Sequence, residues 1–165
     1  MSDAHWSGGA PTETQRAEPT RIAGLATWTN NAAESRAATA KIVGLWARFT
    51  SEGWFDHLER VGAVGPPVAV YTGYKTDASG DYHVVVGRDF PPASGAPPGV
   101  ELVRVPAGRY LVFAFEGTVP DVVIHGWRQV WTFFSQPRQL RRAYTADLEM
   151  YHADGAGVDI WIAVR

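Results

Sequence analysis

The sequence has no cysteine among its 165 residues. This absence excludes disulfide bonds, thiolate nucleophiles, iron–sulfur clusters and cysteine-ligated zinc. It fits a reducing compartment, so we expect a cytoplasmic protein. Long apolar runs are also missing: the longest strong one, Tyr110–Phe115, is far below the roughly 18 residues of a membrane-spanning helix. Residues 1–5 lack the charged and then apolar pattern of a signal peptide, so we expect no membrane association.

An excess of basic residues is absent as well. Fifteen Lys and Arg stand against 17 Asp and Glu, which leaves a formal net charge of −2. Proteins that bind nucleic acids usually carry a basic surface because they neutralise phosphates. We therefore expect no direct nucleic-acid binding. The short cluster of Arg138, Arg141 and Arg142 is interpreted as a solvated loop.

Motifs for common catalytic chemistry are missing too. The chain has no glycine-rich phosphate-binding loop and no Gly-x-Ser-x-Gly sequence of a serine hydrolase. Its five histidines show none of the spacings of a zinc site, and His83 is interpreted as a partly exposed strand residue. We expect neither a metal nor another cofactor.

Proline and glycine divide the chain into parts. Residues 1–20 are polar, with Trp6 as their one aromatic side chain, and this composition predicts a disordered tail. The segment 91–99 holds four prolines and two glycines, which disfavour both helix and central strand. It separates two parts of similar length, 21–90 and 100–165, within a chain whose length suits one domain.

The two parts repeat the same order of elements. Alternation and helical spacing predict strand, helix, strand and strand in each. The first repeat has strands at 21–29, 68–75 and 81–87 and a helix at 33–52 that Gly53 ends; the second has strands at 109–116, 147–152 and 158–164, a helix at 120–135, and a short strand at 101–105 expected to pair beside 109–116. Two β-α-β-β units predict an α+β fold with one antiparallel sheet, two main helices and a pseudo-two-fold axis.

The repeat extends to single residues. Ile42, Trp46 and Phe49 have the same spacing as Trp127, Trp131 and Phe134. Tyr74 and Tyr151 each precede a turn that contains Asp and Gly. The junction of two related halves is a natural place for a ligand cleft.

One carboxylate stands out in this aromatic setting. Strand alternation places Asp147, Glu149 and Tyr151 on one face. The equivalent strand of the first repeat has Thr72 at the Glu149 position, which favours a central strand over a solvated edge. A carboxylate among aromatic rings attracts cations, with cation–π attraction of about 0.5–2 kcal/mol for each ring. Alternatively, burial raises its pKa and it acts as a general acid or base.

Six motifs in order resemble the GyrI-like family, the effector-binding domain of AraC-type and multidrug-sensing bacterial regulators, which also occurs alone and in integron-cassette proteins. They are Arg21-Ile-Ala-Gly-Leu, Gly44-Leu-Trp-Ala-Arg-Phe49, Val70-Tyr-Thr-Gly-Tyr74, Tyr82-His-Val-Val-Val-Gly87, Val105-Pro-Ala-Gly-Arg-Tyr110 and Ala143-Tyr-Thr-Ala-Asp-Leu-Glu-Met-Tyr151. The resemblance covers about residues 20–165. It implies a tandem β-α-β-β fold of the SHS2-like type, with a small-molecule cleft between the halves.

The resemblance also implies a ligand class and a site. Family members often bind bulky, apolar, cationic compounds over an acidic residue, which corresponds to Glu149. Candidate wall residues are Trp46, Tyr71, Tyr74, Trp127, Trp131, Tyr144 and Tyr151. Core packing remains an equal alternative for Trp46 and Trp131, whereas Phe113 and Phe115 fit the core better, and Trp161 fits either surface.

Regulators of this family carry a helix-turn-helix domain before the effector domain, and the twenty residues before the first repeat are too few to build one. We therefore expect a ligand sensor or sequestering protein. Two alternatives remain: a hydrolase that uses Glu149 to open cyclopropane-type antibiotics, and a module that modulates gyrase. A homodimer formed through an edge strand is a further expectation.

Overall fold

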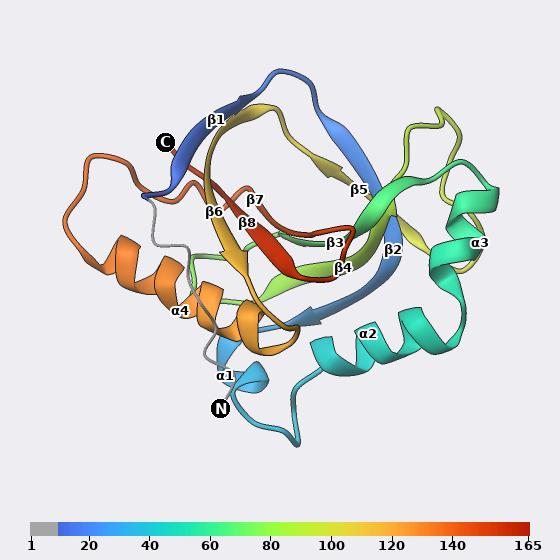
Figure 1. The fold of residues 1–165 in the computed structure, drawn as a ribbon, viewed down its shortest axis with the longest axis horizontal. Helices are drawn as coiled ribbons and strands as arrows, with labels where there is room; N and C mark the ends of the chain where they lie inside the picture. The colour runs from blue at the N-terminus through green and yellow to red at the C-terminus, as the bar shows by residue number, and fades with distance from the viewer. Residues whose placement is uncertain (1–9) are drawn as a thin grey trace.

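The computed structural model describes residues 10–165, which form one mixed α+β unit (Figure 1). Trp6 lies outside the described residues. Eight strands and four helices follow one another in the described part of the chain: β1 (Thr12–Arg16), β2 (Thr20–Thr29), α1 (Asn31–Glu34), α2 (Ile42–Ser51), α3 (Trp54–Arg60), β3 (Val64–Thr72), β4 (Tyr82–Asp89), β5 (Glu101–Val105), β6 (Gly108–Glu116), α4 (Asp121–Ser135), β7 (Ala146–Tyr151) and β8 (Gly157–Ala163).

All eight strands join one antiparallel sheet in the order β1-β6-β8-β7-β3-β4-β2-β5. The order is symmetric about the contact between β7 and β3: β8, β6 and β1 follow on one side, and β4, β2 and β5 on the other. Each side holds the three long strands of one repeat. The predicted α+β fold with a pseudo-two-fold repeat is therefore confirmed, and β7 is a central strand.

The outermost strand on each side belongs in sequence to the other repeat. β1 precedes the first repeat but pairs with β6 of the second, and β5 precedes the second repeat but pairs with β2 of the first. Three residues join β1 to β2, and they span at most roughly 14 Å. In a flat sheet six strand spacings of about 4.8 Å would separate these two strands. The sheet therefore curls until its edges approach each other, as Figure 1 shows.

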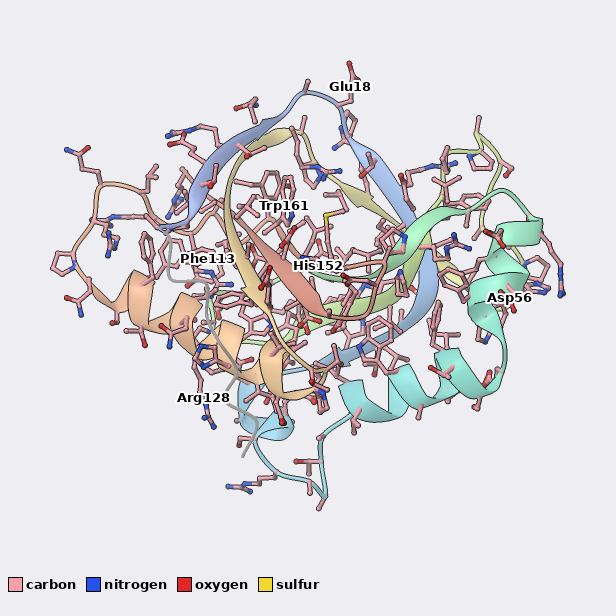
Figure 2. All side chains as sticks on the ribbon, viewed as in Figure 1. Glu18, Asp56, Phe113, Arg128, His152 and Trp161 are labelled. Atoms are coloured by element: carbon pink, nitrogen blue, oxygen red, sulfur yellow. The ribbon has the colours of Figure 1, made fainter. Side chains whose placement is uncertain are left out.

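The curl divides the core into two sides. One apolar cluster, which includes Val70, Tyr110 and Leu148 with Trp161 packed against it, lies inside the curved sheet, where Figure 2 labels Trp161. The other side is covered by helices, with α2 and α3 over the first repeat and α4 over the second. Trp127 contacts both helix-side clusters. α2 and α4 lie on either side of the seam between β7 and β3, and neither helix covers it (Figure 1).

Three expectations need correction. Disorder of residues 1–20 is wrong for 12–16, because these residues pair along β6, and Arg109 Nη2 lies 2.7 Å from Glu13 Oε1. The strand at 101–105 pairs with β2, not with 109–116. The helix expected at 33–52 is two helices, because α1 ends at Glu34, whose carboxylate accepts hydrogen bonds from Thr29 and from the Lys41 amide. Gly53, with a φ of 69°, follows the end of α2 as predicted, but it also precedes a separate helix, α3, that was not predicted.

Within residues 10–165, every helix is too short or too polar to cross a lipid bilayer.

Candidate functional site

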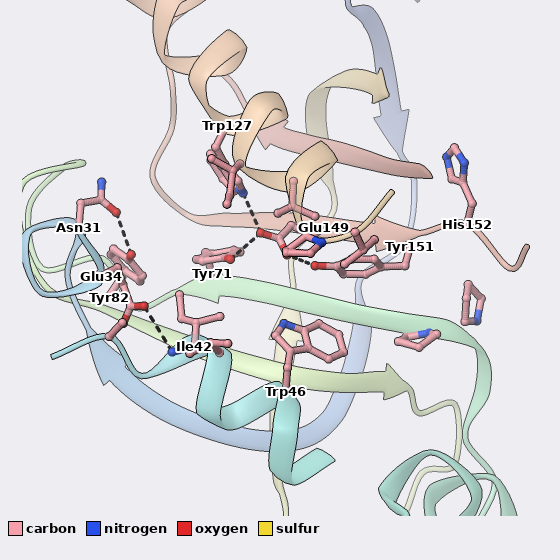
Figure 3. A pocket seen from close by; sticks show the side chains of 18 of the residues that line it. Asn31, Glu34, Ile42, Trp46, Tyr71, Tyr82, Trp127, Glu149, Tyr151 and His152 are labelled. Carbon is pink, nitrogen blue, oxygen red and sulfur yellow. Dashed lines mark hydrogen bonds between the residues drawn. The ribbon is translucent and has the colours of Figure 1, made fainter. Parts of the chain in front are cut away.

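A cavity of about 1500 Å³ lies on the helix side of the seam, between α2 and α4. Its walls come from both repeats, and its floor is formed by β3 and β7 (Figure 3). Most of the lining side chains are apolar or aromatic, and they include Ile42, Val43 and Trp46 of α2, Ile124, Trp127 and Trp131 of α4, and Tyr71, Glu149 and Tyr151 of the sheet.

Glu149 is the acidic residue at the floor, and its side chain is almost fully buried, with 1% exposure. Three neutral groups donate hydrogen bonds to it: the Tyr71 hydroxyl at 2.6 Å and Trp127 Nε1 at 2.7 Å to Oε1, and the Tyr151 hydroxyl at 2.6 Å to Oε2. Figure 3 shows the three rings converging on the carboxylate. Among the described residues no Lys, Arg or His forms an ion pair with Glu149.

Burial and hydrogen bonding act on Glu149 in opposite directions. Removal from water raises the pKa of Glu149, and the donors Tyr151, Tyr71 and Trp127 lower it, but burial dominates and the pKa lies above its usual value. The pKa values of the Tyr71 and Tyr151 hydroxyls are also raised, first by burial and then by the negative charge of Glu149. Both phenols therefore stay protonated and act as donors at neutral pH.

The predicted site residues lie together with one exception. Trp46, Tyr71, Tyr74, Trp127, Trp131, Glu149 and Tyr151 all line the cavity. The Trp46 ring packs edge-on against Tyr151 at 5.1 Å and against Phe49 at 5.8 Å, so it contributes to wall and core together. Trp131 is 45% exposed and lies at the rim. Tyr144 does not line the cavity: it lies behind Arg142, whose guanidinium carbon is 4.5 Å from its ring centroid.

The arginine expected in a solvated loop belongs to this site. The Arg142 side chain is only 6% exposed, and its Nη2 lies 2.7 Å from Oδ2 of fully buried Asp147. The Tyr74 hydroxyl also donates to Asp147 Oδ2, at 2.5 Å, and the Ala163 amide donates to Oδ1 at 3.0 Å. Strand alternation had placed Asp147 on the face of Glu149. That Arg142 pairs with Asp147 depends on the path of the loop before β7, and no local sequence pattern predicts this path.

Sequence reasoning also missed wall residues that lie in the short helix α1 or near the ends of other elements. Asn31 and Glu34 of α1, Pro66 and Pro67 of β3, and Pro120 before α4 line the cavity. Tyr82 lines it as well, and its hydroxyl donates to Asn31 Oδ1 at 2.8 Å. A periodic pattern marks residues that share the face of a long helix or strand, and it does not reach residues in a four-residue helix or at the ends of strands.

The arrangement offers apolar contacts, hydrogen-bond donors and negative charge to a molecule in the cavity. The cavity presents flat aromatic surfaces, and at its floor three protonated donors surround the carboxylate of Glu149, which has no ion-pair partner among the described residues. In the described part of the chain no three His, Asp or Glu side chains gather as metal ligands would.

Two β-α-β-β repeats that share one sheet and enclose an acidic, aromatic cavity over their seam define a class of tandem-repeat effector-binding domains. A family model described as integron-associated effector binding protein matches residues 15–164. The chain belongs to this family, and the resemblance seen in the sequence motifs is confirmed.

Similar proteins agree with this assignment. The chain is 30% identical over 152 residues to YobU of Bacillus subtilis (strain 168), a candidate transcriptional regulator, and the match covers 88% of this chain and 92% of YobU. An integron cassette protein from the mobile metagenome of Vibrio cholerae has a similar structure, with a TM-score of 0.76, 28% identity and coverage of 94% and 96%. SAV2435, solved bound to tetraphenylphosphonium, shares the fold with a TM-score of 0.76, 18% identity and coverage of 95% and 94%.

Proposed function

We propose that this protein binds bulky aromatic cations in the cavity between its two repeats, as a sensor or a sequestering protein. The observation that supports this most is the buried carboxylate of Glu149, which has only neutral hydrogen-bond donors around it. A buried charge without a counter-ion is costly, and a cation that brings its own apolar surface removes that cost.

The walls support an aromatic ligand. Tyr71, Trp127 and Tyr151 contact the carboxylate, and Trp46 lines the cavity beside Tyr151. Ring faces attract a desolvated cation by up to about 2 kcal/mol each. The volume of about 1500 Å³ leaves room for a ligand with several rings. The fold shared with SAV2435, which was solved with tetraphenylphosphonium, makes that cation a suitable first probe. Tyr74 and Trp131 would contact the outer part of the ligand, and Tyr144 would act through Arg142.

The test is a calorimetric titration with tetraphenylphosphonium and with neutral triphenylphosphine oxide. In Glu149→Gln the affinity for the cation should fall about tenfold or more, equal to about 1.4 kcal/mol, while the neutral compound should bind nearly as before. Glu116→Gln, on the exposed part of β6, is the matched control and should bind both compounds as the wild type does. A cation affinity that survives Glu149→Gln unchanged would contradict the proposal.

The same variant separates the alternatives. A hydrolase would keep its binding in Glu149→Gln and lose turnover of a cyclopropane-containing compound. A gyrase-modulating module would keep its partner when the cavity is filled. Absence of nucleic-acid binding, a homodimer and a cytoplasmic location stay predictions.

A further inference from the structure

We propose that Arg142 is a resident cation that fills a second acidic and aromatic subsite of the cavity and thereby restricts ligands to a single positive charge. The inference rests on the proposed function and adds the charge class of the ligand and the residue that selects it.

Two carboxylates occupy equivalent places on β7. Asp147 and Glu149 are two residues apart on one face of the strand, so their backbones are separated by about 6.6 Å. Both are buried, with exposures of 0% and 1%. Each accepts a short hydrogen bond from a tyrosine of the same segment, Tyr74 for Asp147 and Tyr71 for Glu149. β7 therefore contains two buried acidic positions, of which Glu149 lines the cavity and Asp147 contacts Arg142 and Tyr74, which line it.

The two positions differ in what neutralises them. Glu149 has neutral donors, whereas Asp147 is paired with the guanidinium of Arg142 at 2.7 Å. The guanidinium carbon lies 4.5 Å from the centroid of Tyr144 and 6.0 Å from those of Tyr74 and Trp127. A carboxylate with aromatic rings around a cation is the environment proposed for the ligand at Glu149. Around Asp147 the protein supplies the cation itself.

Arg142 is part of the cavity wall, and its hydrogen bonding is incomplete. It lines the cavity beside Trp127 and Tyr74. Its Nε is buried and has no hydrogen-bond partner among the described residues. A guanidinium that only stabilised the fold would normally form hydrogen bonds with more of its five N–H donors. The pair with Asp147 instead leaves the floor with one net negative charge, at Glu149.

This arrangement determines which ligands fit. A monocation placed at Glu149 neutralises the floor. A dication whose charges are separated by two joined rings would bring its second charge close to Arg142, and like charges in a desolvated site repel strongly. Without Arg142, the second charge would meet Asp147.

The experiment compares two flat ligands of similar shape by calorimetry at pH 8: N-methyl-4-phenylpyridinium, a monocation, and methyl viologen, a dication. The wild type should bind the monocation about tenfold more tightly or better. In Arg142→Gln the affinity ratio of dication to monocation should rise at least about tenfold. Equal affinities in the wild type, or an unchanged ratio in a folded Arg142→Gln, would overturn the inference.

The double variant Arg142→Gln/Asp147→Asn is the matched control, because it opens the same space but removes the second negative charge. Its ratio should rise less than in Arg142→Gln, because the repulsion from Arg142 is lost but no carboxylate meets the second charge, and a gain as large as in Arg142→Gln would show that space rather than charge selects the ligand. If thermal melting shows that Arg142→Gln does not fold, equal affinities of the wild type for the two cations would still overturn the inference. A wild type that binds neither cation would refute the proposed function itself, whereas one that binds both equally would refute only this inference.

Discussion

Glu149 links the chemistry of the cavity to pH. Burial raises the pKa of its carboxyl, and the protonated form cannot pair with a cation. The phenols of Tyr71 and Tyr151, which donate to it, stay protonated at neutral pH because burial and the charge of Glu149 raise their pKa values. Burial lowers the pKa of Arg142, but Asp147 raises it more, and it lies above its usual value.

Cation binding should therefore tighten as the pH rises above 4.5 and through the raised pKa of Glu149, and then level off. Within that range binding should release protons, which calorimetry in buffers of different ionisation enthalpy detects. In Glu149→Gln both effects should disappear. An affinity that is flat from about pH 4.5 to about pH 8 in the wild type would contradict this prediction.

The same shift affects stability. Because the folded pKa of Glu149 lies above the unfolded one, its contribution to stability is present below about pH 4.5 and is lost as the pH rises through the folded pKa. Relative to the wild type, Glu149→Gln should therefore gain stability with rising pH, measured by urea unfolding at each pH. A difference between the two proteins that stays constant with pH would contradict the assignment.

The tyrosines provide a further test at the residue scale. Tyr151→Phe removes a donor that lowers the pKa of Glu149, so this pKa should rise further and the midpoint of cation binding should move to higher pH. Tyr82→Phe is the control, because its hydroxyl bonds to Asn31 and not to Glu149. NMR titration of the Glu149 carboxyl carbon checks both. Equal midpoints in the wild type and Tyr151→Phe would show that the bond is unimportant.

At the scale of elements, the distance between α4 and the sheet controls the floor of the cavity. Gly126 faces the sheet, where a Cβ would lie 2.8 Å from Ile160 Cδ1 and 3.0 Å from Phe115 Cδ2. Its neighbour Trp127 donates to Glu149. Because Gly126 has no side chain, α4 lies close enough to the sheet for Trp127 to donate its hydrogen bond to Glu149.

Gly126→Ala should lower the free energy of unfolding by about 1–3 kcal/mol through overpacking, and it should weaken cation binding by moving Trp127. Gly44→Ala in α2 is the matched control, since a Cβ at this position would have open space within 4 Å. It should raise the free energy of unfolding by up to about 1 kcal/mol through helix propensity. Urea unfolding measures both, and a neutral Gly126→Ala would show that α4 adjusts freely.

At the scale of the whole molecule, the exchanged strands close the curl. Arg16 of β1 lies 5.9 Å from the ring centroid of Tyr110 in β6 and 5.5 Å from that of Trp161 in β8, and its Nη2 donates to Thr20 of β2 at 2.7 Å. One residue thus connects strands of both repeats. Without β1, the edge of β6 would be open to pairing with other chains.

Deletion of residues 1–16 should lower the Tm by several degrees and promote association, measured by calorimetry and light scattering. Deletion of residues 1–9 is the control, because it retains every described residue, so any further loss in the longer deletion belongs to 10–16. Equal Tm values for the two truncations would show that β1 contributes nothing.

Much of the site follows from local patterns. Alternation places Glu149 and Asp147 on one face, and helical spacing places Trp46 and Trp127 on the sheet side of their helices. These patterns survive folding because the geometry of a strand or helix fixes which residues point together. The helix at 33–52 was wrong in its first half, since the hydrogen bonds of Glu34 to Thr29 and Lys41 outweigh helix propensity there.

The order of residues along the chain was enough to establish the two repeats, the central strand and the face that carries the acids, because each depends on near neighbours. Three features emerged only from the folded molecule: β1 and β5 exchange between repeats, Tyr144 stands behind Arg142, and Asp147 is neutralised while Glu149 is not. These features depend on contacts between distant segments and on exclusion of water, and both arise only when the sheet has curled and the helices have packed on it.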